Sequence, residues 1–267
     1  MSSLESLEGH SFPPRLLRVC SEKVAEFVAA TGDLSDRWQA AAPPGFAAAL
    51  LFAVAPDLLE DPRVEGAVVH GDQTFVWHGP LRIETDLSVS GVVERVRSRS
   101  GVVFVTFALE ARSDDSPVLE GRSTFLVGGE GLGMPEVAPI PPEQRGPTAS
   151  VGHELPMPRS TSRADLVRYA AATRDWNPIH WDHATAVEAG LGGVVVHGLL
   201  QSAWLTQVAA TAASGDAPLA SARFRYTAPL RPGEAARIEG NPSPPSPELR
   251  LVVGDTVTVT GRLQVRA

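Results

Sequence analysis

An acid, an amide and an imidazole fall close together in this chain, at Asp175, Asn177 and His180. Pro178 disfavours helical dihedral angles at Asn177, so we expect the preceding helix to end around Arg174. Asp175 and His180 then lie on non-helical backbone, where a turn can direct both side chains to one point. A carboxylate and an imidazole held in this way can bind one water molecule and move its protons. The segment therefore predicts general acid-base chemistry.

The composition limits the classes of protein. A chain of 267 residues with 43% hydrophobic content can form one large domain or two of ordinary size. The net charge of -8 argues against a nucleic-acid or anionic-membrane surface. Cys20 is the sole cysteine, which excludes an internal disulfide and a cysteine metal cluster. The N-terminus lacks a signal-peptide pattern, and the longest apolar run, residues 45–55, is too short to span a bilayer. We expect a globular cytoplasmic protein in which this run forms a buried helix.

Residues 129–160 have a different composition from the segments on either side. They show no sustained apolar period, and they carry seven prolines, at positions 135, 139, 141, 142, 147, 156 and 158. Such a segment is typical of a linker. The sequence therefore predicts two units, residues 1–128 and residues 161–267.

The two units share a weak internal repeat. Residues 27–33 align with residues 169–175, and residues 75–82 align with residues 224–231. The matches occur in the same order, and their offsets of 142 and 149 residues differ by only seven, as one short insertion would produce. We infer that one unit was duplicated.

Each half shows helical signals first and strand signals afterwards. In the second half Ser162 and Asp165 resemble a capping box, Asp182 and Gly190 would begin and end a short helix, and residues 199–213 predict a helix buried on every side. Alternating segments predict strands at residues 222–226, 249–253 and 256–265, and in the first half at 73–78, 87–96, 102–110 and 120–127. This order indicates an α+β fold in which antiparallel sheets wrap a central apolar helix in each half.

These motifs resemble the MaoC-like, or hydratase 2, branch of the hot-dog superfamily. The second half carries the resemblance through Tyr169, Asp175, Asn177-Pro-Ile-His180, Asp182 and Val196-His-Gly-Leu199. The first half is similar to the N-terminal dehydratase-like domain of this family, through Ala42-Pro-Pro-Gly-Phe46, His70-Gly-Asp-Gln73 and His78-Gly-Pro-Leu-Arg82. The resemblance covers nearly the whole chain and implies a double hot-dog fold with one continuous sheet surface and an active site between the halves.

The resemblance also implies a reaction. It is the reversible syn addition of water to a trans-2-enoyl thioester of coenzyme A or acyl carrier protein, which gives an (R)-3-hydroxyacyl product without a cofactor or a metal ion. Asp175 and His180 would be the catalytic pair, Asn177 would support their geometry, and the backbone N–H of Gly198 would be an oxyanion donor. Which member of the pair takes the first proton stays open, because coupled groups titrate jointly.

The first half departs from this pattern. Asp33 corresponds to Asp175, whereas Ser35, Asp36 and Trp38 stand where the second half has Asn177, Pro178 and His180. Without the imidazole, we expect the first half to be structural, with one active site per chain.

Several other polar residues have ordinary structural explanations. We expect Asp182 to be only a helix cap, and His70, His78 and His183 to be structural. For His197, packing or a local hydrogen bond is the more usual role than direct chemistry. An arginine at position 82 or 231 could meet a coenzyme A phosphate or form a surface salt bridge. No His, Asp and Glu spacing resembles a metal site.

Two other functions remain to be weighed against a hydratase. One is a non-catalytic or partner-dependent hot-dog subunit of a larger dehydratase. The other is an acyl-CoA thioesterase, which the Asp-x-Asn-Pro-x-His string disfavours. The sequence leaves open the acyl chain length, branching and bulk, the carrier, the direction of the reaction and the oligomeric state, a homodimer included.

Overall fold

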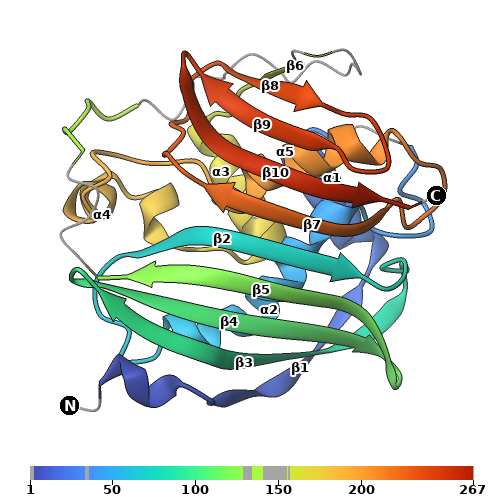
Figure 1. Ribbon diagram of the computed structural model, residues 1–267, viewed down its shortest axis with the longest axis horizontal. Helices are drawn as coiled ribbons and strands as arrows, with labels where there is room; N and C mark the ends of the chain where they lie inside the picture. The colour runs from blue at the N-terminus through green and yellow to red at the C-terminus, as the bar shows by residue number, and fades with distance from the viewer. Residues whose placement is uncertain (1–2, 34–35, 129–133, 141–154, 156, 267) are drawn as a thin grey trace.

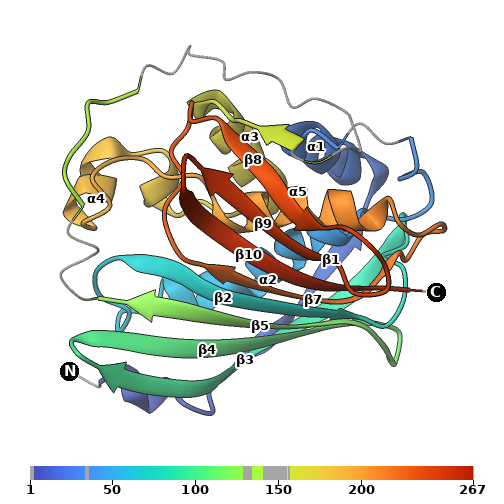
Figure 2. The ribbon, with the colours of Figure 1, turned by 45° about the horizontal axis from the view of Figure 1, so that its top comes forward.

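The computed structural model describes residues 3–33, 36–128, 134–140, 155 and 157–266. In this part of the chain the strands form one antiparallel ten-stranded sheet in the order β1-β3-β4-β5-β2-β7-β10-β9-β8-β6 (Figure 1). The first half supplies β1 (Ser11–Val19), β2 (Val68–Trp77), β3 (Thr85–Arg99), β4 (Val102–Ser113) and β5 (Ser116–Val127). The second half supplies β6 (Met157–Arg159), β7 (Leu219–Tyr226), β8 (Ala236–Asn241), β9 (Glu248–Val253) and β10 (Thr256–Val265). Strands β2 and β7 lie side by side where the halves join (Figure 2).

The sheet has an internal two-fold pseudosymmetry. Counted along the chain, each half has the same strand order, first-third-fourth-fifth-second, and the halves meet at their second strands. At this junction Thr74 lies opposite Arg223, its equivalent at the offset of 149 residues. A pseudo-two-fold axis therefore passes between these two residues, as expected for an isologous pairing of related units. This geometry supports the duplication inferred from the sequence.

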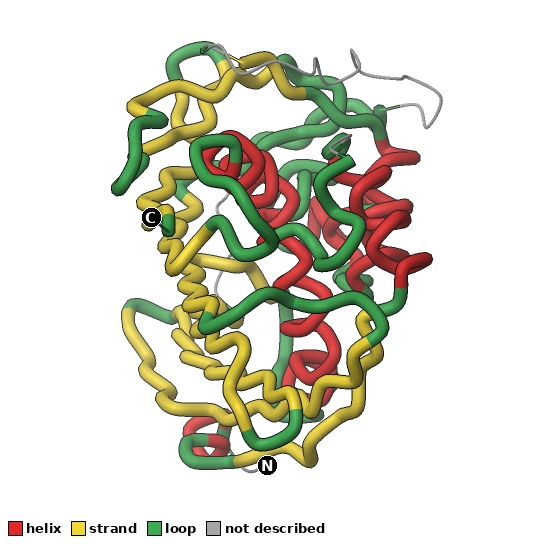
Figure 3. The backbone as a smooth tube through the Cα atoms, turned by 90° about the vertical axis from the view of Figure 1, so that its right-hand side faces the viewer, coloured by secondary structure: helices red, strands yellow, loops and turns green. Residues whose placement is uncertain are grey.

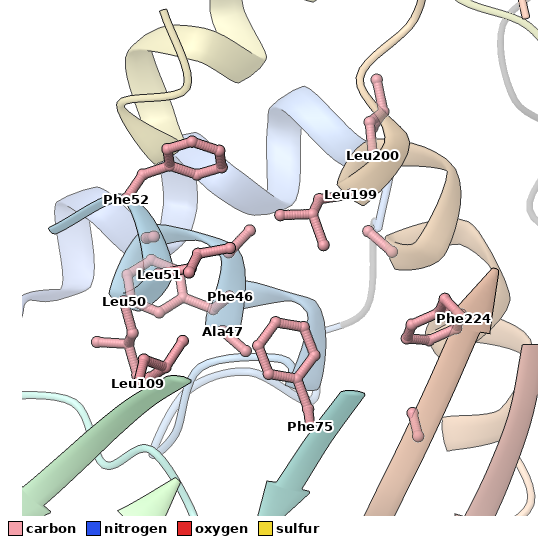
Figure 4. Packing of buried hydrophobic residues seen from close by; sticks show 14 of the residues in the cluster. Phe46, Ala47, Leu50, Leu51, Phe52, Phe75, Leu109, Leu199, Leu200 and Phe224 are labelled. Carbon is pink, nitrogen blue, oxygen red and sulfur yellow. The ribbon is translucent and has the colours of Figure 1, made fainter. Parts of the chain in front are cut away.

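The long helices cover one face of the sheet (Figure 3). The two central helices are α2 (Ala47–Leu59), which follows the short turn η2 (Pro44–Phe46), and α5 (Gly198–Ala210). Phe75 of β2 and Phe224 of β7 point from the sheet toward these helices (Figure 4). Gly261 allows α5 to approach β10 closely, because a Cβ atom there would lie 3.0 Å from the Leu205 Cδ1 atom. Burial of these apolar faces forms the core.

Helices α1 (Ser21–Thr31) and α3 (Arg163–Thr173) are the next equivalent pair, and they pack on each other. The rings of Phe27 and Tyr169, which the repeat aligns, lie 6.0 Å apart between their centroids. Both helices end in a left-handed residue, Gly32 with φ 66° and Arg174 with φ 68°. The remaining short helices are η1 (Leu4–Leu7), η3 (Pro178–His180) and α4 (His183–Glu188).

The predicted α+β double hot-dog class is confirmed, with the two sheets joined into one. Three strands were not predicted: β1, β6 and β8. Strand β6 lies within residues 129–160, the predicted linker, and pairs with β8. Residues 129–133, 141–154 and 156 of that linker lie outside the described residues, so the domain boundaries stay a prediction. Helix α5 ends at Ala210, three residues before the expected end.

The apolar run at residues 45–55 forms η2 and most of α2, as expected of a buried helix. No helix in the described part of the chain is long and apolar enough to cross a membrane.

Candidate active site

The candidate site begins where α3 ends. The predicted capping box is present, since Ser162 Oγ accepts from the Asp165 N–H (3.2 Å) and the Asp165 carboxylate accepts from the Ser162 N–H (2.9 Å). The helix ends at Thr173, and the left-handed conformation of Arg174 turns the chain away from the helix axis. The Asp175 N–H then donates to Thr173 Oγ1 (3.3 Å). The helix thus ends where the sequence predicted, and it delivers Asp175 to the interior.

Asn177 links this turn to the other half of the chain. Its Oδ1 atom accepts from the Ile179 N–H (3.4 Å) and caps η3. Its Nδ2 atom donates to the carbonyl oxygen of Val68 in β2 (2.9 Å). The amide therefore fixes the turn locally and also anchors it to the first half.

His180 lies at the end of η3 with only 7% of its surface exposed. Its Nδ1 atom lies 2.8 Å from the Val195 carbonyl oxygen. Because a carbonyl can only accept, Nδ1 carries the hydrogen and the neutral ring has a free lone pair on Nε2. Burial lowers the pKa of His180 to about 4, against a smaller opposing effect of the bond to Val195. His180 is thus neutral near pH 7 and can accept a proton at Nε2.

Asp175 is 6% exposed, and its environment raises its pKa, whereas that of His180 is lowered. Burial raises the pKa of Asp175 to about 7, although the backbone N–H of Asn177 opposes this shift. A carboxylate oxygen of Asp175 and a ring nitrogen of His180 lie within 4.8 Å of each other. Between about pH 4 and pH 7 these shifts leave Asp175 protonated and His180 neutral, so the pair carries one exchangeable proton, on Asp175.

A cavity of about 160 Å³ brings the four predicted site residues together, since Asp175, Asn177, His180 and Gly198 all line it. Gly198 is the first residue of α5, where the N–H groups have no partner within the helix and the helix dipole favours negative charge. A Cβ atom at Gly198 would lie 3.0 Å from the Tyr226 ring, so only glycine fits without displacing the ring. The first half lines the cavity with Phe52, Leu59, Val68, Val69, His70, Gly71, Phe125 and Leu126.

A second cavity, of about 710 Å³, adjoins the first, and six residues line both: Phe52, Leu59, Val68, Asp175, Asn177 and Ile179. It too is lined from both halves, by α2 and the start of β2 on one side and by α4 on the other. A ligand that reaches Asp175 therefore has space on two sides of the pair.

His197, for which the sequence favoured packing or a local hydrogen bond over direct chemistry, makes contacts of both kinds with the predicted pair. It is fully buried, its ring stacks on His180 with centroids 3.8 Å apart and planes 26° apart, and its Nε2 atom lies 3.2 Å from the backbone oxygen of Asp175. Asp175, His180 and His197 each offer a metal-ligand atom, all within 4.8 Å. A bound ion lies in the plane of an imidazole ring, about 2.0–2.1 Å from its nitrogen, and two near-parallel stacked planes cannot share one such point. The geometry favours a packed pair over joint metal ligation.

The equivalent position in the first half is occupied differently. The Asp33 carboxylate accepts a hydrogen bond from the indole Nε1 of Trp38 (2.8 Å), the residue aligned with His180. An indole N–H is a donor only, so it cannot take a proton from water. Ser35 lies outside the described residues. The residue aligned with His180 therefore donates a hydrogen bond to this carboxylate and provides no proton acceptor.

The other polar residues singled out in the sequence have local partners. Asp182 caps α4 through the Thr185 N–H (2.7 Å), His78 lies 3.0 Å from Glu120, and Arg231 donates to the Leu191 carbonyl oxygen (2.8 Å). His70 is different, because it lines the smaller cavity between the rings of Phe125 and Tyr226. Remaining residues from the sequence analysis, Arg82 and His183, are absent from the lining of both cavities.

Comparison with known proteins places these features in a family. The family model of the MaoC like domain matches residues 144–243. A UPF0336 protein of Streptomyces coelicolor is 34% identical over 113 residues, 36% of this chain and 75% of the relative. Mesaconyl-C(4)-CoA hydratase of Chloroflexus aurantiacus is 30% identical over 161 residues, 58% of this chain and 54% of the relative.

Solved structures show the same fold. A MaoC-like dehydratase superimposes with a TM-score of 0.79 and 21% identity, covering 99% of both chains. A Mycobacterium tuberculosis protein described as having a double hot-dog fold superimposes with a TM-score of 0.65 and 13% identity, covering 97% of this chain and 96% of its own. The chain therefore belongs to the MaoC-like family and has a double hot-dog fold.

Proposed function

We propose that this protein hydrates trans-2-enoyl thioesters to (R)-3-hydroxyacyl thioesters, or catalyses the reverse dehydration, without a metal ion. The observation that carries the proposal is the cavity that Asp175 and His180 line together with Gly198, the first residue of α5. Burial raises the pKa of Asp175 and lowers that of His180, which favours a proton donor and a proton acceptor side by side. The similarity to a hydratase that acts on a coenzyme A thioester supports this class of chemistry.

In the proposed hydration, His180 Nε2 takes one proton from water while the water oxygen bonds to C3 of the enoyl group. The protonated carboxyl of Asp175 gives its proton to C2. Because both groups line one cavity, the water oxygen and the proton can both reach the same face of the double bond. The proton on His180 then returns to Asp175 through the next water molecule, and dehydration follows the reverse path.

Negative charge accumulates on the thioester oxygen between these proton transfers. The Gly198 N–H and the N-terminal field of α5 would stabilise it. Loss of such a donor costs about 2.7–4 kcal/mol of transition-state stabilisation in other enzymes. Glycine also lets the thioester approach the backbone.

We infer that the substrate lies between the halves, because both cavities are lined by residues from each half. The larger cavity offers space for an acyl chain or for the pantetheine arm, which both carriers share. A panel of enoyl thioesters that vary in chain length, branching and carrier would identify the substrate class.

The test is the loss of the ultraviolet absorbance of the conjugated enoyl thioester after addition of the purified protein. We expect loss with the wild type and with Asp182→Asn, a matched control outside the cavity, and none with Asp175→Asn or His180→Ala. Release of free thiol at the same rate would instead indicate a thioesterase. Folded wild-type protein that leaves every thioester of the panel unchanged would contradict the proposal for this chain alone.

A further inference from the structure

We propose that His197 is a positioning residue for the catalytic pair: its ring fixes the plane of the His180 imidazole, while its Nε2–H holds the peptide unit of Asp175. This inference rests on the proposed function, and it assigns a role to a residue that touches neither the reacting atoms nor the substrate.

The first contact is the ring stack. The centroids of His197 and His180 lie 3.8 Å apart with an interplanar angle of 26°. His180 has one further fixed point, the bond from Nδ1 to the Val195 carbonyl oxygen (2.8 Å). A single hydrogen bond leaves the ring free to tilt about it. The stacked surface of His197 removes that freedom and directs Nε2 of His180 to one place in the cavity.

The second contact is a hydrogen bond. His197 Nε2 lies 3.2 Å from the backbone oxygen of Asp175. Since the carbonyl accepts, Nε2 carries the hydrogen, and Nδ1 of the neutral ring has no partner among the described residues. The bond holds the carbonyl end of Asp175 just after the left-handed turn at Arg174. One side chain therefore touches both members of the pair.

His197 can serve this purpose because it is itself held firmly. It is fully buried, it directly precedes Gly198, and its own carbonyl oxygen accepts from the Gln201 N–H (3.3 Å) in the first turn of α5. The Tyr169 ring of α3 packs on it at 4.9 Å between centroids. A shift of the His197 backbone would thus move Gly198 as well. Through its contacts with His180 and Asp175, the His197 side chain therefore fixes the positions of both residues relative to the Gly198 N–H.

The titratable groups around His197 favour its neutral form. Burial, and next the neighbouring His180, lower the pKa of His197 well below its ordinary value, while the bond to Asp175 opposes the shift. Tyr169, the α3 side chain whose ring packs on His197, has its pKa raised by burial and then by Asp175, so it stays uncharged. A neutral ring can stack on His180 without repelling the proton that His180 receives during the reaction.

Three variants separate the two contacts. His197→Phe keeps a stacking ring and loses the hydrogen bond, His197→Gln keeps a donor and loses the ring, and His197→Ala loses both. We expect kcat to fall about 10-fold in each of the first two and about 100-fold in the third, with KM nearly unchanged, because one hydrogen bond or stack corresponds to about 1.4 kcal/mol and misplacement of a catalytic group to about 100-fold. His78→Gln, at an exposed histidine of the first half, is the control and should keep wild-type kcat.

The pKa of His180 distinguishes a positioning role of His197 from a role in stability alone. In His197→Ala, water reaches the exposed face of His180, so the pKa of His180 should rise from about 4 toward its ordinary value. The acid limb of kcat/KM then moves to higher pH. His197→Phe keeps the face covered and should keep the acid limb. An NMR titration of the His180 ring in both variants measures the same shift without any activity.

The inference is overturned if His197→Ala keeps the wild-type kcat. It is also overturned if the loss of kcat in this variant equals the fraction of unfolded protein and the His180 titration is unchanged. If the wild type itself has no hydratase activity, the proposed function fails, and the NMR titration still decides whether His197 covers His180. If the alanine variant does not fold, the phenylalanine and glutamine variants decide, since equal wild-type rates in both would leave neither contact a role.

Discussion

Asp175→Asn should remove activity and at the same time stabilise the protein at alkaline pH. The folded state binds a proton at Asp175 with a pKa of about 7, whereas the unfolded chain releases it near the ordinary value of 3.8. Between these values the folded state holds a proton that the unfolded state lacks, so the free energy of unfolding falls as pH rises and is lowest above pH 7. Asparagine carries no charge at any pH and escapes this penalty.

The magnitude follows from the shift of roughly three pKa units. At about 1.36 kcal/mol per unit, the buried carboxylate lowers the unfolding free energy by about 4 kcal/mol at pH 8 and by about 2 kcal/mol at pH 5. The stability of Asp175→Asn relative to wild type should therefore increase by about 2–3 kcal/mol between pH 5 and pH 8. The lowered pKa of His180 affects both proteins, so it largely cancels in the difference.

Urea unfolding followed by tryptophan fluorescence at pH 5 and pH 8 measures this difference, since the chain has five tryptophans. Asp182→Asn is the matched control. Its carboxylate caps α4 and has a lowered pKa, mainly from the bond to the Thr185 backbone. It is ionised at both pH values, so its effect should be the same at both. If Asp175→Asn also shows the same difference at both pH values, Asp175 is ionised when folded and cannot be the proton donor.

Three further outcomes follow from the geometry. The kcat/KM of the wild type should be highest between about pH 4 and pH 7, falling below as His180 gains a proton and above as Asp175 loses one; a rate that continues to rise past pH 8 would contradict the one-proton pair. Gly198→Ala should lower kcat about 10- to 100-fold in steady-state assays, because the new Cβ meets the Tyr226 ring and displaces the N–H; an unchanged kcat would argue against this N–H as oxyanion donor. Asp33→Asn should keep wild-type kcat/KM, because the Asp33 carboxylate binds the Trp38 indole; loss of activity in folded protein would mean that the first half takes part in the chemistry.

Sequence reasoning worked best where the determinants were local. The capping box of Ser162 and Asp165 and the end of α3 before Pro178 depend on residues a few positions apart, and both are present. The repeat offset of 149 residues also carried three-dimensional information, because equivalent residues meet at the pseudo-two-fold axis. These features need no knowledge of distant contacts.

The missed features depend on contacts between distant segments. Strand β1 contains Pro13 and Pro14, which weaken a strand pattern, and it exists as an edge strand through its pairing with β3. Strand β6 is three residues long and is defined by its pairing with β8. His197 follows His180 by seventeen residues, so its ring stack could not be inferred from spacing. The stack forms because the fold brings the residue that precedes α5 against the last residue of η3.

The pseudosymmetry and the chemistry diverge at one position. The axis relates Asp175 to Asp33, yet the residue that faces each carboxylate is a histidine in one half and a tryptophan in the other. In the first half the Trp38 indole donates a hydrogen bond to the Asp33 carboxylate. The first half still contributes to the candidate site, because the Val68 carbonyl oxygen accepts the hydrogen bond from the Asn177 side chain. The second half therefore supplies the reactive groups, but the carbonyl oxygen that anchors their turn belongs to the first, so neither half contains the whole site.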